Sequence, residues 1–155
     1  MVDHKPALFY KKIIRFNDNC GRLQLYEVRY PSHALIEAVF TPARNGGPDS
    51  GLHSETFIMD SYNFMTPTTD NKKRYYWFQL RNIRPHGAVL SKVMTEDVQH
   101  AFEEDRDVLN AVQKGMSNKS LPHIDLSIDG SQLRFCRQLK ATISEKQQVD
   151  SQMAK

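Results

Sequence analysis

Residues 9–83 show the alternation of apolar and polar side chains that is typical of half-buried strands. The clearest case is His33–Thr41, where Ile36, Ala38 and Phe40 fall on one face. Turn-forming residues separate the segments. The pattern predicts five strands, namely Phe9–Phe16, Arg22–Tyr30, His33–Thr41, about Ser54–Met65 and about Lys73–Ile83. These connections favour an antiparallel meander, with residues 66–71 as a longer hairpin loop.

The second half of the chain follows the 3.6-residue period of helices instead. Thr95 is the expected N-cap of a helix that runs to about Met116, and a short extended piece, His123–Ile128, follows. A final helix is expected over Ser131–Glu145. The predicted fold class is α+β, a curved antiparallel sheet with a long helix packed on it. We expect one domain over residues 1–147 and a polar C-terminal tail over 148–155, with the last ten residues frayed.

The apolar stripe of the long helix contains a carboxylate. Val98, Phe102, Leu109, Val112 and Met116 recur every three or four residues, and Asp105 occupies the position between Phe102 and Leu109. Burying an ionised carboxylate is costly unless it is paired, hydrogen-bonded or metal-bound. Three explanations are open. Asp105 is a buried ion-pair partner or hydrogen-bond acceptor for a neighbouring element, for example Arg81 or Arg134; it lies at a helix edge near water; or it is a metal-binding or catalytic carboxylate. Periodicity alone favours the two structural explanations.

Composition excludes some classes of function. The chain has 155 residues, a formal net charge of +3 and basic residues scattered along its length, so a nucleic-acid interface is not expected. No apolar run is long enough to cross a membrane, and the N-terminus has no apolar signal core. The two cysteines have no zinc-type spacing and are expected to be reduced thiols. These features predict a cytoplasmic protein without nucleic-acid or membrane partners.

Several motifs in order resemble the C-terminal catalytic region of Rieske non-haem iron oxygenases, in the branch of vanillate O-demethylase and dicamba monooxygenase. They are "HALIEAVFTPARNGG", "NFMTPTTD", "YYWFQLRNIRP", "VQHAFEEDRDVLNAVQKGM" and "IDLSIDGSQLRFCRQLKATISEK". The resemblance extends from about Tyr10 to Lys146. Thr68 stands where the family's turn usually has an acid, and Pro85-His86-Gly87 lies where acids are common. These departures bear on the substrate.

The resemblance implies that Asp105 is the carboxylate of a two-histidine-one-carboxylate site for mononuclear Fe(II). The two histidine ligands should form a His-x4-His pair, and no two of the six histidines here have that spacing. The Cys/His segments of a [2Fe-2S] Rieske cluster are also absent. We therefore expect the His ligands and the cluster on a missing N-terminal segment or polypeptide. No cofactor is firmly predicted for this chain alone, and no residue is predicted to be catalytic.

The resemblance also implies a substrate pocket between the sheet and the helices, with Ile36, Ala38, Phe40 and Asn63 in its lining. Asn63 could contact a substrate oxygen or simply form a turn at the strand end. Trp77, Tyr75 and Phe78 of "RYYWFQL" could line a pocket or fill the core, and core filling is favoured. Arg81-Asn82 is expected to organise the sheet–helix junction. The implied partners are a reductase or ferredoxin that donates electrons, an aromatic or similar organic acid as substrate, and further copies of the chain in a homo-oligomer.

Two functions follow. The first is the C-terminal part of the oxygenase component of a Rieske-type mono- or dioxygenase, acting by aromatic hydroxylation or O-demethylation and inactive alone. The second is a helix-grip, START-like domain that binds a small ligand without redox chemistry, which the missing histidines favour. A non-functional remnant with exposed apolar surface is a third, weaker interpretation.

Overall fold

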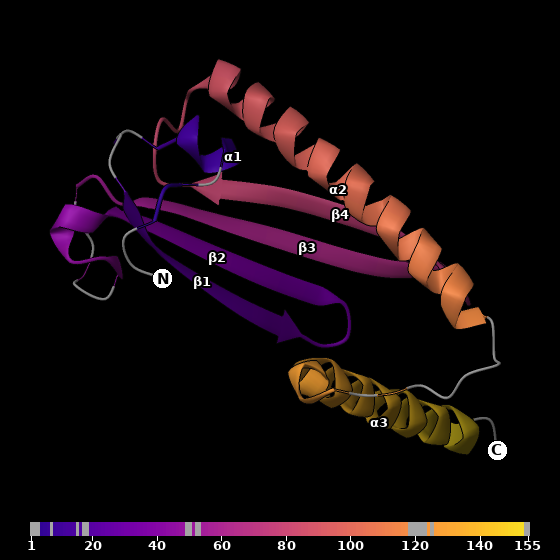
Figure 1. Cartoon of the computed structure of the whole chain (residues 1–155). Coiled ribbons are helices and arrows are strands. Elements are labelled where there is room, and N and C mark those ends of the chain that lie inside the picture. The colour runs from indigo at the N-terminus through magenta and orange to yellow at the C-terminus, as the bar shows by residue number, and fades with distance from the viewer. Residues whose placement is uncertain are drawn as a thin grey trace.

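The computed structural model describes residues 4–6, 8–14, 16, 19–48, 51, 54–117, 124 and 126–153. In this part of the chain an open, curved antiparallel sheet has the order β1-β2-β3-β4, and the long helix α2 crosses one of its faces (Figure 1). The strands are β1 (Cys20–Arg29), β2 (His33–Pro42), β3 (Phe57–Thr69) and β4 (Lys72–Arg81). The helices are α1 (Leu8–Lys11), η1 (Ala43–Asn45), α2 (Ala88–Ser117), η3 (Ser127–Asp129) and α3 (Gly130–Met153). The predicted α+β class is confirmed.

The strand register defines an inner face of the sheet, which α2 covers. Tyr26 pairs with Ile36, Ile36 with Ser61, and Ser61 with Gln79. Because neighbouring strands are in register and side chains alternate along each strand, these residues share one face. The row therefore runs across all four strands beneath the helix.

The core fills the end of the inner face where α2 begins. Phe40 and Phe57 are each 1% exposed, and their ring centroids lie 5.9 Å apart. Tyr10 lies over Phe40 at 4.1 Å, and Met94 of α2 is buried against the same group. The other buried members of this core are Ile13, Ile14, Phe16, Cys20, Ala38 and Met59. The apolar cluster anchors both α1 and the start of α2 on the sheet.

The predicted first strand, Phe9–Phe16, is wrong. Residues 8–11 form the helical turn α1, and the backbone N–H groups of Ile13 and Ile14 both donate to the carbonyl of Tyr10. Ile13 and Ile14 are adjacent and both buried. A strand would point them to opposite faces, whereas a turn lets both enter the core. The described part of the chain therefore has four strands where the sequence predicts five.

The hairpin between β3 and β4 is tighter than expected. Residues 66–69 continue β3 instead of forming a loop, so only Asp70 and Asn71 separate Thr69 from its partner Lys72. Pro67 lies at a register irregularity beyond the last β2 partner of β3, which is Phe64. A proline is tolerated there because its missing N–H has no strand to bond on that side.

Helix α2 begins seven residues before the expected N-cap, at Ala88 instead of Thr95. The guanidinium of Arg81 donates to the carbonyls of Ile83, Arg84 and Gly87 at 3.0–3.3 Å and to Ser91 Oγ at 3.0 Å. Asn82 Nδ2 donates to the carbonyl of Thr56, and Asn82 Oδ1 accepts from the N–H of Ile58. The expected role of Arg81-Asn82 at the sheet–helix junction is therefore confirmed.

Helix α3 lies beyond the β1–β2 turn and touches the sheet only lightly (Figure 1). Phe135 stacks on Tyr30 with ring centroids 5.1 Å apart. The helix continues to Met153. The prediction of a frayed end is therefore wrong for residues 146–153, which are helical. Of the predicted extended piece His123–Ile128, residues 123 and 125 lie outside the described residues, and its end belongs to η3.

None of the described helices is long and apolar enough to cross a membrane.

Candidate functional site

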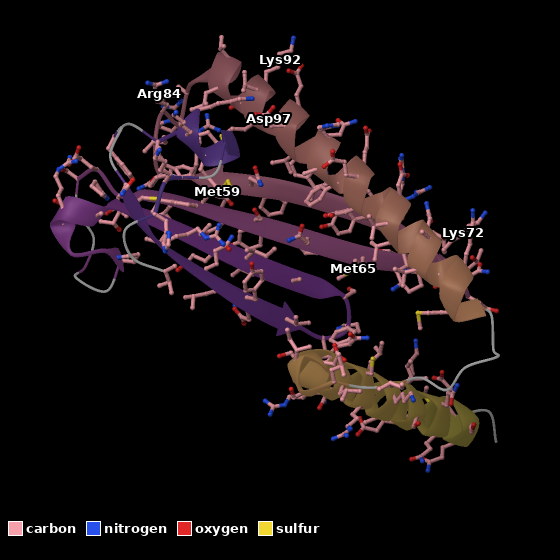
Figure 2. The ribbon with its side chains drawn as sticks, in the orientation of Figure 1. Met59, Met65, Lys72, Arg84, Lys92 and Asp97 are labelled. Carbon is pink, nitrogen blue, oxygen red and sulfur yellow. The ribbon has the colours of Figure 1, made fainter. Side chains whose placement is uncertain are left out.

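A cavity of about 470 Å³ lies between the inner face of the sheet and α2, beside the core. Aromatic rings form part of its wall, and neutral polar side chains of three strands form much of its floor. Asp97 lies on the first half of α2, near α1, with Met59 on the sheet beneath them (Figure 2). The lining residues are Tyr10, Lys12, Gln24, Tyr26, Ile36, Met59, Ser61, Asn63, Gln79, Asp97, Val98, Ala101 and Phe102. Its size suits a single-ring aromatic ligand.

The structure separates the four residues predicted to bind substrate. Ile36 and Asn63 line the cavity, whereas Ala38 and Phe40 are 1% exposed and belong to the core. All four face the same side of the sheet. The alternation along β2 therefore identifies the residues of the inner face, but it does not show which of them are buried in the core and which line the cavity. Substrate contact at these positions stays a prediction.

The side chain of Asn63 is buried, and its hydrogen-bonding groups are used within the protein. Its Oδ1 accepts a 2.5 Å hydrogen bond from the Tyr75 hydroxyl, and its Nδ2 donates to the carbonyls of Ser61 at 3.2 Å and Ala34 at 3.4 Å. Burial raises the pKa of the Tyr75 phenol, and the negative charge of Asp105 raises it further. Asn63 thus orients Tyr75 toward the side of α2 that carries Asp105.

Polar side chains that the sequence interpretation did not single out also lie in the floor. Gln79 Nε2 donates to Ser61 Oγ at 3.0 Å, and the Tyr26 hydroxyl donates to Gln24 Oε1 at 3.3 Å. No described residue accepts the Ser61 hydroxyl proton or donates to Gln79 Oε1. A ligand hydroxyl or ether could use that donor and acceptor. Polar residues at inward positions of β3 and β4 were the available sequence signal.

Two charged side chains line the cavity, and they form an ion pair. Lys12 Nζ lies 2.9 Å from Asp97 Oδ2 and 3.3 Å from Asp97 Oδ1. The lysine follows α1, and the aspartate lies on α2, 85 residues away. No sequence spacing would have connected them, because the contact depends on how α1 and α2 pack.

Asp105 lies on the helix face of Phe102 but is exposed to solvent. Phe102 contacts the rings of Tyr75 and Trp77 edge-on, with centroids 5.3 and 5.4 Å away. Two turns beyond Phe102 the stripe no longer packs on the sheet, and Leu109 is 66% exposed. Of the open explanations, an ion pair with Arg81 is not formed, because the Arg81 guanidinium binds the carbonyls before α2. In the described part of the chain Asp105 lies at an edge near water.

The described residues do not form an iron site on their own. Among them no group of three or more His, Cys, Asp or Glu side chains comes together in a way that could hold a metal ion. His100 lies on the same helix as Asp105 but pairs with Glu104 at 3.5 Å on the exposed surface. A lone exposed carboxylate supplies one of the three protein ligands that a facial Fe(II) site requires.

Comparison with known proteins gives a consistent result. Residues 1–145 match the family described as the vanillate O-demethylase oxygenase C-terminal domain. The chain is 27% identical over 135 residues to a vanillate O-demethylase oxygenase subunit of Pseudomonas sp. (strain ATCC 19151), covering 85% of this chain and 40% of that protein. A second such subunit, from Pseudomonas sp. (strain HR199 / DSM 7063), is 30% identical over 118 residues, covering 73% of this chain and 32% of that protein.

A more distant relative is the iron-sulfur subunit of a toluene-4-sulfonate monooxygenase system from Comamonas testosteroni. It is 26% identical over 108 residues, covering 70% of this chain and 31% of that protein. The chain therefore spans between 31% and 40% of the length of these relatives. No solved structure matches the chain significantly.

Proposed function

Because the chain belongs to the family of the vanillate O-demethylase oxygenase C-terminal domain, we propose that it supplies the substrate-binding part of an oxygenase component. The observation that carries the proposal is the family match over residues 1–145 together with the cavity between the sheet and α2. The proposed reaction is hydroxylation or O-demethylation of an aromatic or similar organic acid. The chain is proposed to be inactive alone.

The chain's own residues would bind and orient the substrate. Tyr26 and Phe102 offer aromatic faces to a ring, and Ser61 with Gln79 offers a donor and an acceptor to a ring substituent. Helix α2 lies over the inner face of the sheet (Figure 1), and its Val98, Ala101 and Phe102 form that side of the cavity lining. Fixing the ring in one orientation favours reaction at one substituent, because a positioned reactant has already lost its freedom to rotate.

Asp105 is the one residue of this chain proposed to reach a metal. We propose that the two histidine ligands and the [2Fe-2S] Rieske cluster lie outside this sequence, because it has no His-x4-His pair and no Rieske-type Cys/His segments. The reductase or ferredoxin is proposed as a separate partner. The expected result is that the chain alone does not retain stoichiometric Fe(II) after anaerobic loading.

A chimera tests the proposal directly. This chain would replace the matching C-terminal region of the vanillate O-demethylase oxygenase subunit of Pseudomonas sp. (strain HR199 / DSM 7063), and iron content and product formation would be measured with the electron donor present. We expect the chimera to bind iron, Asp105→Asn to lose it, and Asp107→Asn to keep it as the matched control. Stoichiometric iron held by the isolated chain, or iron retained by the Asp105→Asn chimera, would contradict the proposal.

The alternative is a START-like domain that binds a small ligand without redox chemistry. Two observations favour it. The cavity is large enough for a ring, and among the described residues Asp105 belongs to no group of three that could hold a metal ion. In that case Asp105→Asn would change ligand affinity in the isolated chain equally with and without Fe(II). Calorimetric titration under both conditions separates the two functions.

A further inference from the structure

We propose that Lys12 binds the acid group of an aromatic anion in the cavity, and that Asp97 holds Lys12 until the ligand replaces it. The inference deepens the proposed function and rests on it, since it names the residue that selects an acid as the ligand. The ligand class is a singly charged aryl carboxylate or aryl sulfonate. The argument depends on the charges, the anchoring and the exposure of the Lys12–Asp97 pair.

The cavity carries one positive group for an anion to use. Of the described residues that line it, only Lys12 and Asp97 are charged, and they neutralise one another. The remaining polar groups of the lining are amides and hydroxyls, which bind neutral oxygen substituents as readily as anions. Discrimination between an acid and its neutral analogue therefore falls to Lys12.

The backbone of Lys12 is anchored at the cavity rim, whereas its side chain is more than half exposed. Ile13 and Ile14 directly after it are 3% and 8% exposed, and Tyr10 before it lies 4.1 Å from Phe40. The Lys12 side chain itself is 57% exposed. An anchored backbone with a flexible, half-exposed ammonium group allows Nζ to turn from Asp97 to a ligand without moving the core.

Moving the Lys12 ammonium from Asp97 to the acid group of the ligand costs little free energy. An ion pair between partly exposed side chains adds little to stability, because water solvates both ions well when they separate. Asp97 is 30% exposed, so its carboxylate can take water when the ligand claims Lys12. The replacement is one salt bridge for another, and the ligand gains the hydrogen bonds and ring contacts of the cavity in addition. Asp97 thus competes with the acid group for the same ammonium.

Binding of two probes to the full chain tests the inference without iron or turnover. The probes are toluene-4-sulfonate, which is an anion, and toluene-4-sulfonamide, which is neutral near pH 7 and similar in shape. Dissociation constants would be measured by NMR titration or calorimetry. Lys12→Met should weaken sulfonate binding about threefold to fivefold, the effect of losing one partly exposed charge interaction. It should leave the affinity for the sulfonamide unchanged.

The partner variant should act in the opposite direction. Asp97→Asn removes the competitor of the ligand, so it should tighten sulfonate binding about twofold to threefold. The matched control is Lys92→Met, because Lys92 lies on the outer side of α2 (Figure 2), pairs with Glu96 on the same helix and does not line the cavity. It should bind both probes like the unaltered chain.

Four results would overturn the inference: no sulfonate binding to the unaltered chain, equal affinity for both probes, equal weakening of both by Lys12→Met, or no tightening by Asp97→Asn. Failure of the proposed function looks different. A chimera that binds no iron while the chain still prefers the sulfonate through Lys12 would remove the oxygenase proposal and leave the anion site in place. Thermal melts of each variant confirm that it is folded.

Discussion

The amide of Asn63 and the hydroxyl of Tyr75 form a pair in which each side chain determines the conformation of the other. Asn63 is 3% exposed, and its amide bonds both the strand backbone and the tyrosine. A buried polar group left without a partner costs more than the hydrogen bond itself contributes. The two residues should therefore be energetically coupled.

A double-mutant cycle measures that coupling. Asn63→Ala should lower the free energy of unfolding by about 1–3 kcal/mol, and Tyr75→Phe by about 0.5–1.5 kcal/mol. The double variant should lose less than the sum of the two, because the first change already breaks the shared bond. Urea denaturation of the full chain gives the values. Tyr76→Phe is the matched control on the opposite face of β4 and should change stability by less than about 0.5 kcal/mol. Strict additivity would show that the bond does not form.

Cys20 makes stability depend on pH at the alkaline end. Burial raises the pKa of the Cys20 thiol above its ordinary value, opposed in part by the positive charge of Arg22. A raised pKa in the folded chain means that folding favours the protonated thiol. That contribution is fully present below the pKa of the unfolded chain and is lost as pH rises through the folded pKa.

The unaltered chain should therefore lose more stability than Cys20→Ala when pH is raised from about 7.5 to about 10.5. Urea denaturation at both pH values measures the two losses. Cys136→Ala is the control, because Cys136 is exposed and should leave the pH dependence as it is. Equal losses in the unaltered chain and Cys20→Ala would contradict the prediction. All other ionisable side chains are the same in both proteins, so their effect cancels in the comparison.

At the residue scale, the sequence predicts which face of the sheet a side chain points to better than it predicts how deeply that side chain is buried. The alternation of β2 placed Ile36, Ala38 and Phe40 on the inner face, but burial divides them between cavity and core. Strand periodicity describes one strand, whereas depth depends on what lies above it. Lys12 and Asp97 were missed for the same reason, since their contact joins α1 to α2 across 85 residues.

Among the elements, α2 packs on the sheet along only part of its length. Val98 is 8% exposed and Phe102 is half-buried against two rings of β4, whereas the later members of the stripe are exposed. Apolar residues still recur every three or four positions in the second half of α2, although these later residues do not pack on the sheet. Replacing a side chain of the packed part of the stripe by alanine should therefore lower the free energy of unfolding more than the same change in the exposed part.

Phe102→Ala should lower the free energy of unfolding by about 2–3 kcal/mol, since it removes the ring that fills the space between α2 and β4. Leu109→Ala should change it by less than about 0.5 kcal/mol, because the side chain is already 66% exposed. Urea denaturation of both variants tests the contrast. A large loss in Leu109→Ala would mean that the second half of the stripe is packed in solution.

The elements that the sequence predicted well are those with an unambiguous period. β1, β2 and β4 were each placed to within two residues at both ends because apolar and polar positions alternate along them. The errors fall where local signals compete with tertiary packing. Pro67 indicates a break, but it pairs with Lys73 of β4 and has no neighbouring strand on its other side. Thr95 resembles an N-cap, although Arg81 fixes the helix start seven residues earlier.

On the scale of the whole molecule, the outer face of the sheet carries an uncovered cluster of aromatic and aliphatic side chains on β3 and β4. Tyr62 and Phe78 stack with centroids 4.8 Å apart, and Phe64 lies 6.0 Å from Phe78. Phe78 and Leu80 are 47% and 53% exposed. In the described part of the chain no helix packs on this face (Figure 1). Contiguous exposed apolar surface of this kind favours association.

The chain alone should therefore self-associate through this outer face, and charge placed there should reduce the association. Sedimentation velocity over a wide range of chain concentration would measure it, with Phe78→Lys and Leu80→Lys expected to shift the distribution toward single chains. Val89→Lys is the matched control, since Val89 is 81% exposed but lies on α2, away from the sheet. The homo-oligomer expected from the family resemblance gains support if only the strand variants respond. Single chains at every concentration would show that the outer face does not drive association. An equal effect of Val89→Lys would show that contact between copies does not depend on that face.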